Sequence, residues 1–532
     1  MDKAIQELKD AENSVLQQMN NFQSLFMAVN SLHSIIEDHP NAADKETINS
    51  IASVLNSTRH TRQSKAFFLF RETAKILITL IQTSPDDQLK TECLSLLRRT
   101  INNTSREPLR AVAEAAGSLP VKLSPPKAPE FDISEIPLLT VNEILKSAGI
   151  KKCSNHRWKG RSLLSDIGPD RHLILKIAKP DDDLCAMNME SWFMDYFKRD
   201  FKTEQRFKVP VPLKFSGHYL ISLKDLPKGI TALFPGSPNT ICIACIADKD
   251  YFIYPNEKEE NATINETAFV EMISRNSRLL GELTSKGLVH TAPVPLFHNR
   301  VQQGRRTDDG LYLWYKGGRL DKWLESCRYP NFGKSGIRDF EHIEYYNGNP
   351  VNLYRQIGDH ILSLILVTGS FFRNIGKDNG DPALVGKSGL DKSGNPIDAR
   401  SLFDKDLLQK ALNLILTNYY QGFTGSKDPY TFSCDINNLA RQIINEMGRD
   451  HHMEEVFRVA DQNEMADDDF KAFLMERGLS REDLQTFKKG DKDIITLTGP
   501  HLGGFNQKFS MPDLTDLFAR VASLCMIGKY EK

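Results

Sequence analysis

Glycine is missing from the first 116 residues of this chain, although its 532 residues contain 32 glycines in all. The same region has apolar residues at helical spacing, and a periodic sequence without glycine favours helices over the tight turns of a sheet. We therefore expect an all-helical N-terminal domain over residues 1–117, with about five helices, the last two near 86–103 and 106–117. Such helices form either a protein-binding surface or a solubilising bundle without a partner.

Long apolar runs and an excess of one charge are also lacking. The longest uncharged apolar stretch, residues 361–372, is shorter than the roughly 18–20 residues that span a bilayer, so we expect no membrane span. The 68 basic and 69 acidic residues give a formal charge of −1, which provides no global attraction to nucleic acid or to an anionic membrane. Eight mostly dispersed cysteines and a charged N-terminus without an apolar core favour a cytoplasmic protein over a secreted one.

Prolines concentrate directly after the glycine-free region, with five of them between residues 120 and 137. Proline interrupts helices and favours an extended spacer, so residues 118–138 are predicted to be a Pro-rich linker between domains.

Beyond the linker the pattern changes from helical to β-type. A short helix near 140–148 is followed by strand-like segments, which lie at residues 171–179, 219–223, 240–247 and 251–254. Long helical patterns come later, including one at 357–372 and a helical tail to the C-terminus. Strands first and helices later predict an α+β unit with a smaller lobe at 139–260, a larger lobe at 261–445 and a helical C-terminal extension at 446–532.

Lys176 stands within the apolar strand-like segment, where a lysine is costly unless its ammonium group finds an anion. Glu190 follows 14 residues later on a predicted amphipathic helix, and protein kinases hold the α and β phosphates of ATP with such a lysine and glutamate. Arg161 lies 15 residues before Lys176, where a phosphate-covering hairpin would be. For Lys176 and Glu190, the alternative is a structural salt bridge. For Arg161, the alternative is an exposed arginine on a turn.

The pair Asp339-Phe340 matches a kinase metal-binding turn, with Glu341 in the place of its glycine. Asp339 is therefore a candidate metal ligand, and Asn331, eight residues earlier, is a candidate for the asparagine that holds a second magnesium ion. Counting back five residues from Asn331 places Ser326 where a kinase has its catalytic aspartate.

A second segment, which begins at His290-Thr-Ala-Pro, also has features of a catalytic loop and is followed by Asn299. We rank it lower, because Asn299 lies 40 residues from Asp339, too far for two metal ligands joined by a short hairpin.

An inserted segment between these motifs carries His298, Arg306 and Tyr312. Imidazole, guanidinium and aromatic groups together can grip a phosphate and stack on a base. A basic surface loop is the alternative interpretation of the same composition.

Over residues 150–510 the chain resembles the SidJ-like pseudokinases, a family of kinase-fold protein glutamylases. The resemblance lies in the type and spacing of Arg161, Lys176, Glu190, Asn331, Asp339, His298, Arg306 and Tyr312. It implies a protein-kinase-like two-lobed fold, here preceded by an all-helical, HEAT-like N-terminal domain. It also implies that the first five residues bind ATP and Mg²⁺, and that the insertion at about 290–322 forms a second nucleotide pocket with Asn506.

Members of that family adenylate a protein carboxylate and then let an amine, typically that of free glutamate, attack the acyl-adenylate. The chain departs from the family pattern at His342, where an acidic residue is expected three positions after the metal aspartate. The calmodulin-binding element is only a fragment at residues 484–490, so calmodulin is not an expected partner.

A carboxylate is already ionised at pH 7 and can attack the α-phosphorus of ATP without a general base, so Ser326 favours adenylation over phosphorylation. Lys176, Arg161 and Asp339 are the expected catalytic residues. The rivals are AMP transfer to a hydroxyl, as in the selenoprotein O pseudokinases, and a non-catalytic ATP-binding scaffold. The expected partners are a protein substrate recruited by the N-terminal helices and a small amine or amino acid.

Overall fold

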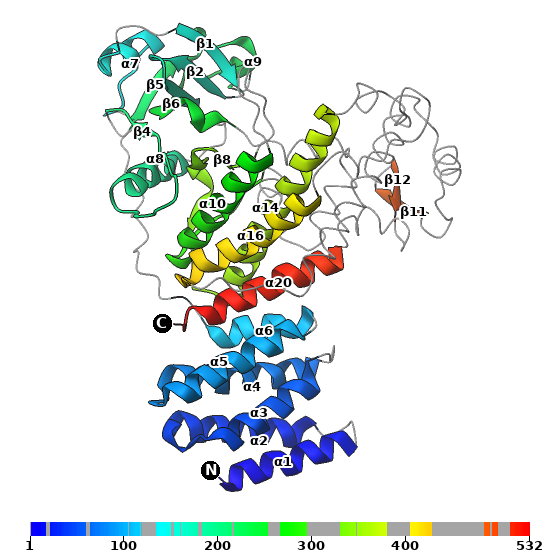
Figure 1. The fold of residues 1–532 in the computed structure, drawn as a ribbon. Helices are drawn as coiled ribbons and strands as arrows, with labels where there is room; N and C mark the ends of the chain where they lie inside the picture. Colours follow the sequence, from blue (N-terminus) through cyan, green and yellow to red (C-terminus); the bar gives the residue numbers. More distant parts are fainter. Residues whose placement is uncertain are drawn as a thin grey trace.

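Helices and antiparallel strands together build the protein, an arrangement that fits the α+β class (Figure 1). The structure is a computed structural model, and it describes residues 2–17, 22–59, 64–104, 106–117, 119, 135–150, 154–159, 161–178, 184–214, 217–232, 234–253, 266–294, 330–346, 348–379, 405–427, 484–489, 492–497 and 511–531.

Six α-helices, rather than about five, form the N-terminal stack. They are α1 (Asp2–Gln17), α2 (Phe22–Asp38), α3 (Lys45–Thr58), α4 (Ser64–Thr83), α5 (Asp87–Asn102) and α6 (Arg106–Ala116), with a 3₁₀ turn at Pro40–Ala42. Asp86 caps α5, because its carboxylate accepts hydrogen bonds from the backbone N–H groups of Gln88 at 2.8 Å and Leu89 at 3.3 Å. The last two helices therefore begin and end within a few residues of their predicted positions.

One antiparallel sheet forms the core of the sheet-bearing part. Its strands are β1 (Ser154–Lys159), β2 (Ser162–Asp166), β3 (Arg171–Ile177), β4 (Val211–Pro212), β5 (His218–Ser222) and β6 (Asn239–Asp248). The order is β1-β2-β3-β6-β4, and β5 also pairs with β6. Three helices accompany the sheet: α7 (Val141–Ser147), α8 (Leu184–Arg199) and the short α9 (Lys228–Thr231).

The strand predicted at 251–254 is wrong where the structure describes it, since Lys249–Phe252 is a 3₁₀ turn. The sheet already ends at Asp248, and the chain turns away there. Tyr251 in this turn and Ile253 directly after it are both buried. Apolar residues at alternate positions predict a strand, but here they are buried in and directly after a turn.

The larger helical part contains α10 (Glu266–Ser285), α14 (Pro350–Asn379) and α16 (Lys405–Thr424), and α20 (Met511–Gly528) ends the described chain. Two small antiparallel pairs follow α10 in the sequence: β7 (Leu288–His290) pairs with β10 (Ile343–Tyr345), and β8 (Phe332–Gly333) pairs with β9 (Gly336–Ile337). No helix among the described residues is both long and apolar enough to cross a membrane.

The predicted helical tail is wrong at residues 484–489 and 492–497, where β11 (Leu484–Lys489) and β12 (Lys492–Leu497) pair as antiparallel strands. β-Branched residues are frequent in this segment, among them Ile494, Ile495 and Thr496, and they favour strands. The fragment that resembles a calmodulin-binding element begins in β11, whereas calmodulin targets bind as amphipathic helices.

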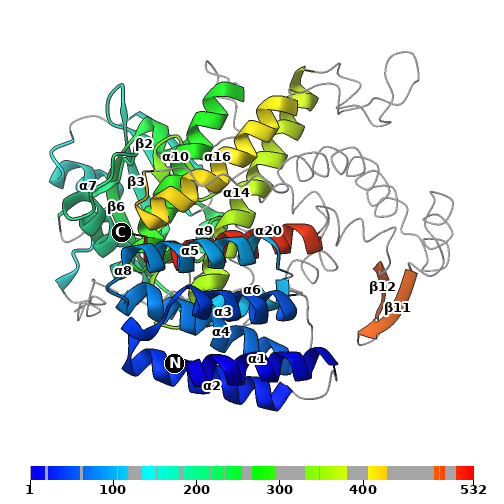
Figure 2. The ribbon, with the colours of Figure 1, turned by 60° about the horizontal axis from the view of Figure 1, so that its bottom comes forward.

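Helix α20 lies between the N-terminal stack and the larger helical part (Figures 1 and 2). It contacts α5 and α6 on one side and α14 and α16 on the other. Ser523 Oγ donates to the Leu109 carbonyl at 3.1 Å, and Lys529 Nζ donates to the Ala116 carbonyl at 2.8 Å. One hydrophobic core therefore extends from Ala4 to Ile527, while a second, smaller core lies within the sheet.

Candidate functional site

A cavity of about 220 Å³ lies where strands β2, β3 and β6 and helix α8 meet the segment 331–341. Its lining consists of Arg161, Ser162, Ile174, Lys176, Glu190, Met194, Pro210, Ile243, Cys245, Tyr251, Asn331, Arg338, Asp339 and Glu341. Pockets that enclose a whole small-molecule ligand measure roughly 300–1,000 Å³, so this cavity is smaller than such pockets. All five residues predicted to bind ATP and magnesium line this cavity.

Lys176 is the centre of the site. Its Nζ lies 3.0 Å from both carboxylate oxygens of Glu190, 2.8 Å from Asp339 Oδ1 and 3.2 Å from Glu341 Oε2. The predicted pairing of Lys176 with Glu190 is therefore present. The structure adds two further carboxylates from a segment more than 160 residues away in the sequence.

The positions of these side chains follow from local structure. Lys176 pairs with Ser162 in the β2–β3 register, so Arg161 lies next to this pair, directly before β2. Glu190 is buried on α8, and the same helix holds the aspartate turn, because the Phe340 ring packs 5.3 Å from Phe197. Burial of Phe340 against α8 thus brings Asp339 towards the lysine.

Three carboxylates, Glu190, Asp339 and Glu341, share the cavity lining with three cations, Lys176, Arg161 and Arg338. Burial on its own lowers the pKa of Lys176, but Asp339, Glu190 and Glu341 outweigh it and hold that pKa well above its usual value. Burial raises the pKa of Glu190 to about 7, although Lys176 opposes the rise. Burial also acts to raise the pKa of Asp339, but Lys176 keeps it below its usual value.

Arg161 contacts the same cluster from the hairpin side. Its Nη1 donates to the Ile177 carbonyl, and its Nη2 lies 3.8 Å from Glu341 Oε1. Glu341 therefore bridges Arg161 and Lys176. The two cations expected to hold phosphates both face this carboxylate.

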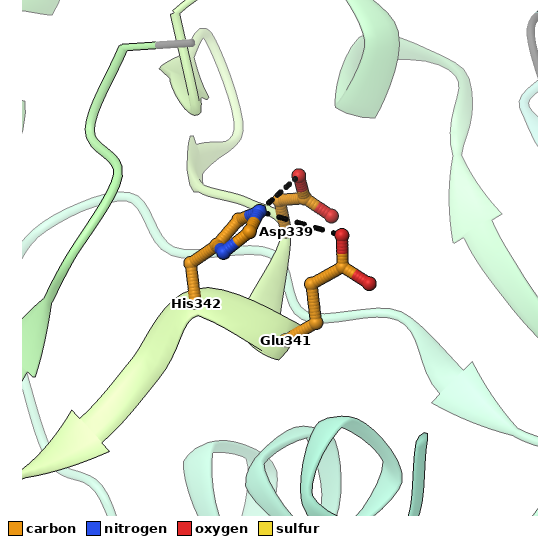
Figure 3. A group of neighbouring side chains, drawn as sticks. All are labelled: Asp339, Glu341 and His342. Atoms are coloured by element: carbon orange, nitrogen blue, oxygen red, sulfur yellow. Dashed lines mark ion pairs between the residues drawn. The ribbon is translucent and has the colours of Figure 1, made fainter. Parts of the chain in front are cut away.

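Asp339, Glu341 and His342 form a group that could hold a divalent cation (Figure 3). One ligand atom from each lies within 4.8 Å of the others, and His342 Nε2 is 3.5 Å from Asp339 Oδ2 and 3.3 Å from Glu341 Oε1. Carboxylate oxygens suit Mg²⁺, and an added imidazole also suits Mn²⁺ and other transition metals. Because two carboxylates and an imidazole converge within this distance, these residues fit a divalent cation.

Asn331 lies beside the His290 segment, although 41 residues separate Asn331 from His290 in the sequence. Its Nδ2 donates to the Ala292 carbonyl at 2.8 Å, and its backbone N–H donates to the Pro293 carbonyl at 2.8 Å. The amide Oδ1 is therefore the atom of Asn331 that could bind a cation. The two segments that the sequence presents as alternative catalytic loops meet at this one site.

Several predicted residues lie outside the part of the chain that the structure describes. These are Asn299, Ser326 and the four residues assigned to a second nucleotide pocket, His298, Arg306, Tyr312 and Asn506. Their assignments remain predictions.

Sequence reasoning missed the contacts of Glu341 and the role of Arg338. Arg338 is buried; its Nη1 donates to the Tyr251 carbonyl at 3.2 Å, and its Nη2 donates to the Pro330 carbonyl. For Glu341, the sequence gives one indication: a glutamate stands where the kinase metal-binding turn has its glycine. No local pattern marks Arg338, because its partners are backbone groups brought together by folding.

Comparison with known proteins gives no family for this chain. No protein-family model matches it, and no curated protein matches it.

Proposed function

We propose that the protein is an ATP-dependent enzyme of protein-kinase-like, two-lobed fold, which adenylates a protein carboxylate and joins an amine to it. The observation that carries the proposal is the Lys176 cluster. Each of the three carboxylates that line the described cavity contacts Lys176. Because all three are paired with Lys176, none of them is a separate general base for a hydroxyl acceptor. A carboxylate acceptor needs no general base.

The order of elements supports a kinase-like fold. A lysine on the third strand pairs with a glutamate on the next helix, as in protein kinases. Farther along the chain, Asn331 and Asp339 flank the short β8–β9 hairpin. The resemblance to SidJ-like pseudokinases rests on these same residues.

In this proposal Ala292 is a second candidate, beside Ser326, for the position of the kinase catalytic aspartate. Ala292 is the third residue of the His290-Thr-Ala segment, and its carbonyl accepts the hydrogen bond from Asn331. An alanine cannot accept a proton, which favours a nucleophile that is already ionised.

The first step transfers AMP to the acceptor. A carboxylate oxygen attacks the α-phosphorus, the bond from that phosphorus to the oxygen bridging the β-phosphate breaks, and pyrophosphate leaves. Lys176 and Arg161 stabilise negative charge on the phosphates. Asp339 and Asn331, with Glu341 and His342, would hold a divalent cation, which when bound neutralises phosphate charge.

The second step forms the amide. The amine nitrogen attacks the acyl carbon, AMP leaves with the electrons of the carbon–oxygen bond, and the nitrogen loses a proton. His298, Arg306, Tyr312 and Asn506 are proposed to hold the adenylate during this step, and the N-terminal helices are proposed to recruit the protein substrate.

The test compares ATP labelled at the α or the γ phosphate, each incubated with the protein, Mg²⁺ and a cell lysate. We expect protein label from α-labelled ATP, released by neutral hydroxylamine as an acyl-adenylate, together with pyrophosphate. Lys176→Ala should abolish labelling, whereas Lys208→Ala, which removes an ion-paired lysine outside the cavity, should not.

Label from the γ phosphate would instead identify an ordinary kinase. A hydroxylamine-resistant α label would identify AMP transfer to a hydroxyl. ATP binding without any label would identify a scaffold.

A further inference from the structure

A chain of buried polar groups runs from helix α16 to the residue that precedes Asp339. Its members are Tyr419 on α16, His360 on α14 and His290 on β7, all at most 1% exposed. Tyr419 OH lies 2.9 Å from His360 Nδ1, and His360 Nε2 lies 3.0 Å from the His290 carbonyl. His290 Nε2 lies 2.9 Å from the Arg338 carbonyl.

The carbonyl partners fix which nitrogen of each imidazole donates. A carbonyl oxygen only accepts, so Nε2 of both imidazoles carries the proton. The Nδ1 atoms are then acceptors, and His290 Nδ1 accepts from the backbone N–H of Ala292 at 3.2 Å. Thr284 Oγ1 also lies 3.4 Å from His360 Nδ1, but it donates to the Leu280 carbonyl at 2.7 Å, so the closer Tyr419 hydroxyl is the donor to His360. Burial lowers the pKa of His290 to about 3 and that of His360 to about 4, so both rings stay neutral with one donor each.

The last acceptor is the carbonyl of the peptide bond that joins Arg338 to Asp339. Asp339 has φ 58° and ψ 62°, a left-handed conformation that non-glycine residues adopt rarely. Such a conformation persists where the surroundings hold it. A hydrogen bond to the Arg338 carbonyl fixes the plane of this peptide and hence the direction from which the Asp339 side chain leaves the backbone.

We propose that Tyr419 and His360 are positioning residues of the site. They act through His290 to hold the plane of the Arg338–Asp339 peptide and, with it, the left-handed conformation of Asp339. They touch neither the cavity nor its carboxylates. The expected effect of these residues on Mg²⁺ and ATP binding rests on the proposed function. Their expected effect on the backbone conformation of Asp339 does not.

The adjacent residue supplies a matched control. Tyr420 is on the same helix and 1% exposed, but its hydroxyl contacts Arg98 at 3.0 Å and Glu531 at 2.6 Å. Tyr419→Phe and Tyr420→Phe each remove one buried hydroxyl from α16, and only Tyr419→Phe breaks the chain to Arg338.

Hydrogen exchange of the segment 336–343, measured by mass spectrometry on the full-length protein without nucleotide, tests the backbone effect. We expect Tyr419→Phe to speed exchange there by about 3- to 10-fold, as on loss of one buried hydrogen bond, and Tyr420→Phe to leave it unchanged. His360→Leu should act like Tyr419→Phe, whereas His360→Gln, which keeps an N–H for the His290 carbonyl, should restore slow exchange. Equal exchange in the two tyrosine variants would overturn the proposal.

Calorimetric titration with ATP, with and without Mg²⁺, tests the functional effect. Tyr419→Phe should reduce the gain in affinity from Mg²⁺ by about 3- to 10-fold and leave metal-free binding unchanged, while Tyr420→Phe changes neither. An undiminished gain in Tyr419→Phe would overturn the link to the metal site. If the wild-type protein binds no ATP, the proposed function fails, and hydrogen exchange alone decides the positioning role.

Discussion

At the scale of single residues, one partly buried lysine holds three carboxylates together. Burial raises the pKa of Glu190, and the neighbouring carboxylates of Glu341 and Asp339 add to the rise, which Lys176 opposes. Removal of one negative charge from the cluster should therefore change its affinity for ATP. The sign of the change depends on whether the residue holds the metal or competes with phosphate for the cations.

Replacement of Asp339 by Asn should remove the Mg²⁺-dependent part of ATP binding, because the variant loses the charge of a proposed ligand. We expect affinity for ATP with Mg²⁺ to fall at least about tenfold in calorimetry, equivalent to about 1.4 kcal/mol. Asparagine tolerates the left-handed conformation, so the fold should persist. Asp170→Asn, an exposed aspartate outside the cavity, is the control. Unchanged Mg²⁺-dependent affinity in Asp339→Asn would exclude the proposed metal role.

Replacement of Glu341 by Gln should strengthen ATP binding measured without metal. The change removes a negative charge that faces Lys176 and Arg161, so both cations become available to phosphate. An increase of about 3- to 10-fold is expected, because a charged contact at about 4 Å that water screens contributes about 1 kcal/mol. Weaker metal-free binding in calorimetry would mean that Glu341 does not compete with phosphate for these cations.

At the scale of elements, helices α10 and α16 approach each other closely at two glycines, Gly281 and Gly422. A Cβ added to Gly281 would collide with the Tyr419 carbonyl, and one added to Gly422 would collide with the Arg278 carbonyl. Backbone atoms cannot move aside as flexible side chains do. The small residues therefore set the spacing of the two helices and, with it, the position of Tyr419.

Replacement of Gly422 by Ala should destabilise the protein by about 1–3 kcal/mol, the usual cost of overpacking, despite the higher helix propensity of alanine. Gly229 on α9 is the matched control, because a Cβ there has open space. Thermal denaturation should show a lower midpoint for Gly422→Ala and a midpoint at or above wild type for Gly229→Ala. An unchanged midpoint in Gly422→Ala would show that the helices can separate without cost.

At the scale of the whole molecule, the N-terminal stack and the larger helical part share one hydrophobic core through α20. Arg98 of α5 and Tyr420 of α16 add a hydrogen bond of 3.0 Å between the two parts. A partner bound to the N-terminal helices would therefore contact a part of the protein that packs, through α20, against α14 and α16.

Replacement of the buried Leu524 on α20 by Ala should cost about 2–5 kcal/mol and weaken both parts together. Hydrogen exchange should accelerate in α5 and α6 as well as in α14 and α16. Ile221→Ala, a comparable truncation in the core of the sheet, should accelerate exchange in the sheet and leave α5 and α6 protected. Acceleration confined to one side of α20 would contradict the shared core.

The sequence by itself determined the features that depend on local spacing. The described residues of the glycine-free region are mostly helical, and the strand with Lys176 precedes the helix with Glu190, because side-chain periodicity and short connections act within about twenty residues. The pairing of Lys176 with Glu190 could be predicted for this reason. Local patterns failed at 251–254 and at 484–489 and 492–497, where the same residue types fit a buried turn and a pair of antiparallel strands.

Only the tertiary structure decided which distant segments meet. It brought Asp339 and Glu341 to Lys176, Asn331 to Ala292, and α20 between the two helical parts. These contacts join residues 39 to more than 400 positions apart in the sequence. No local pattern specifies them, because they arise from burial of Phe340 against α8 and from the packing of one continuous core.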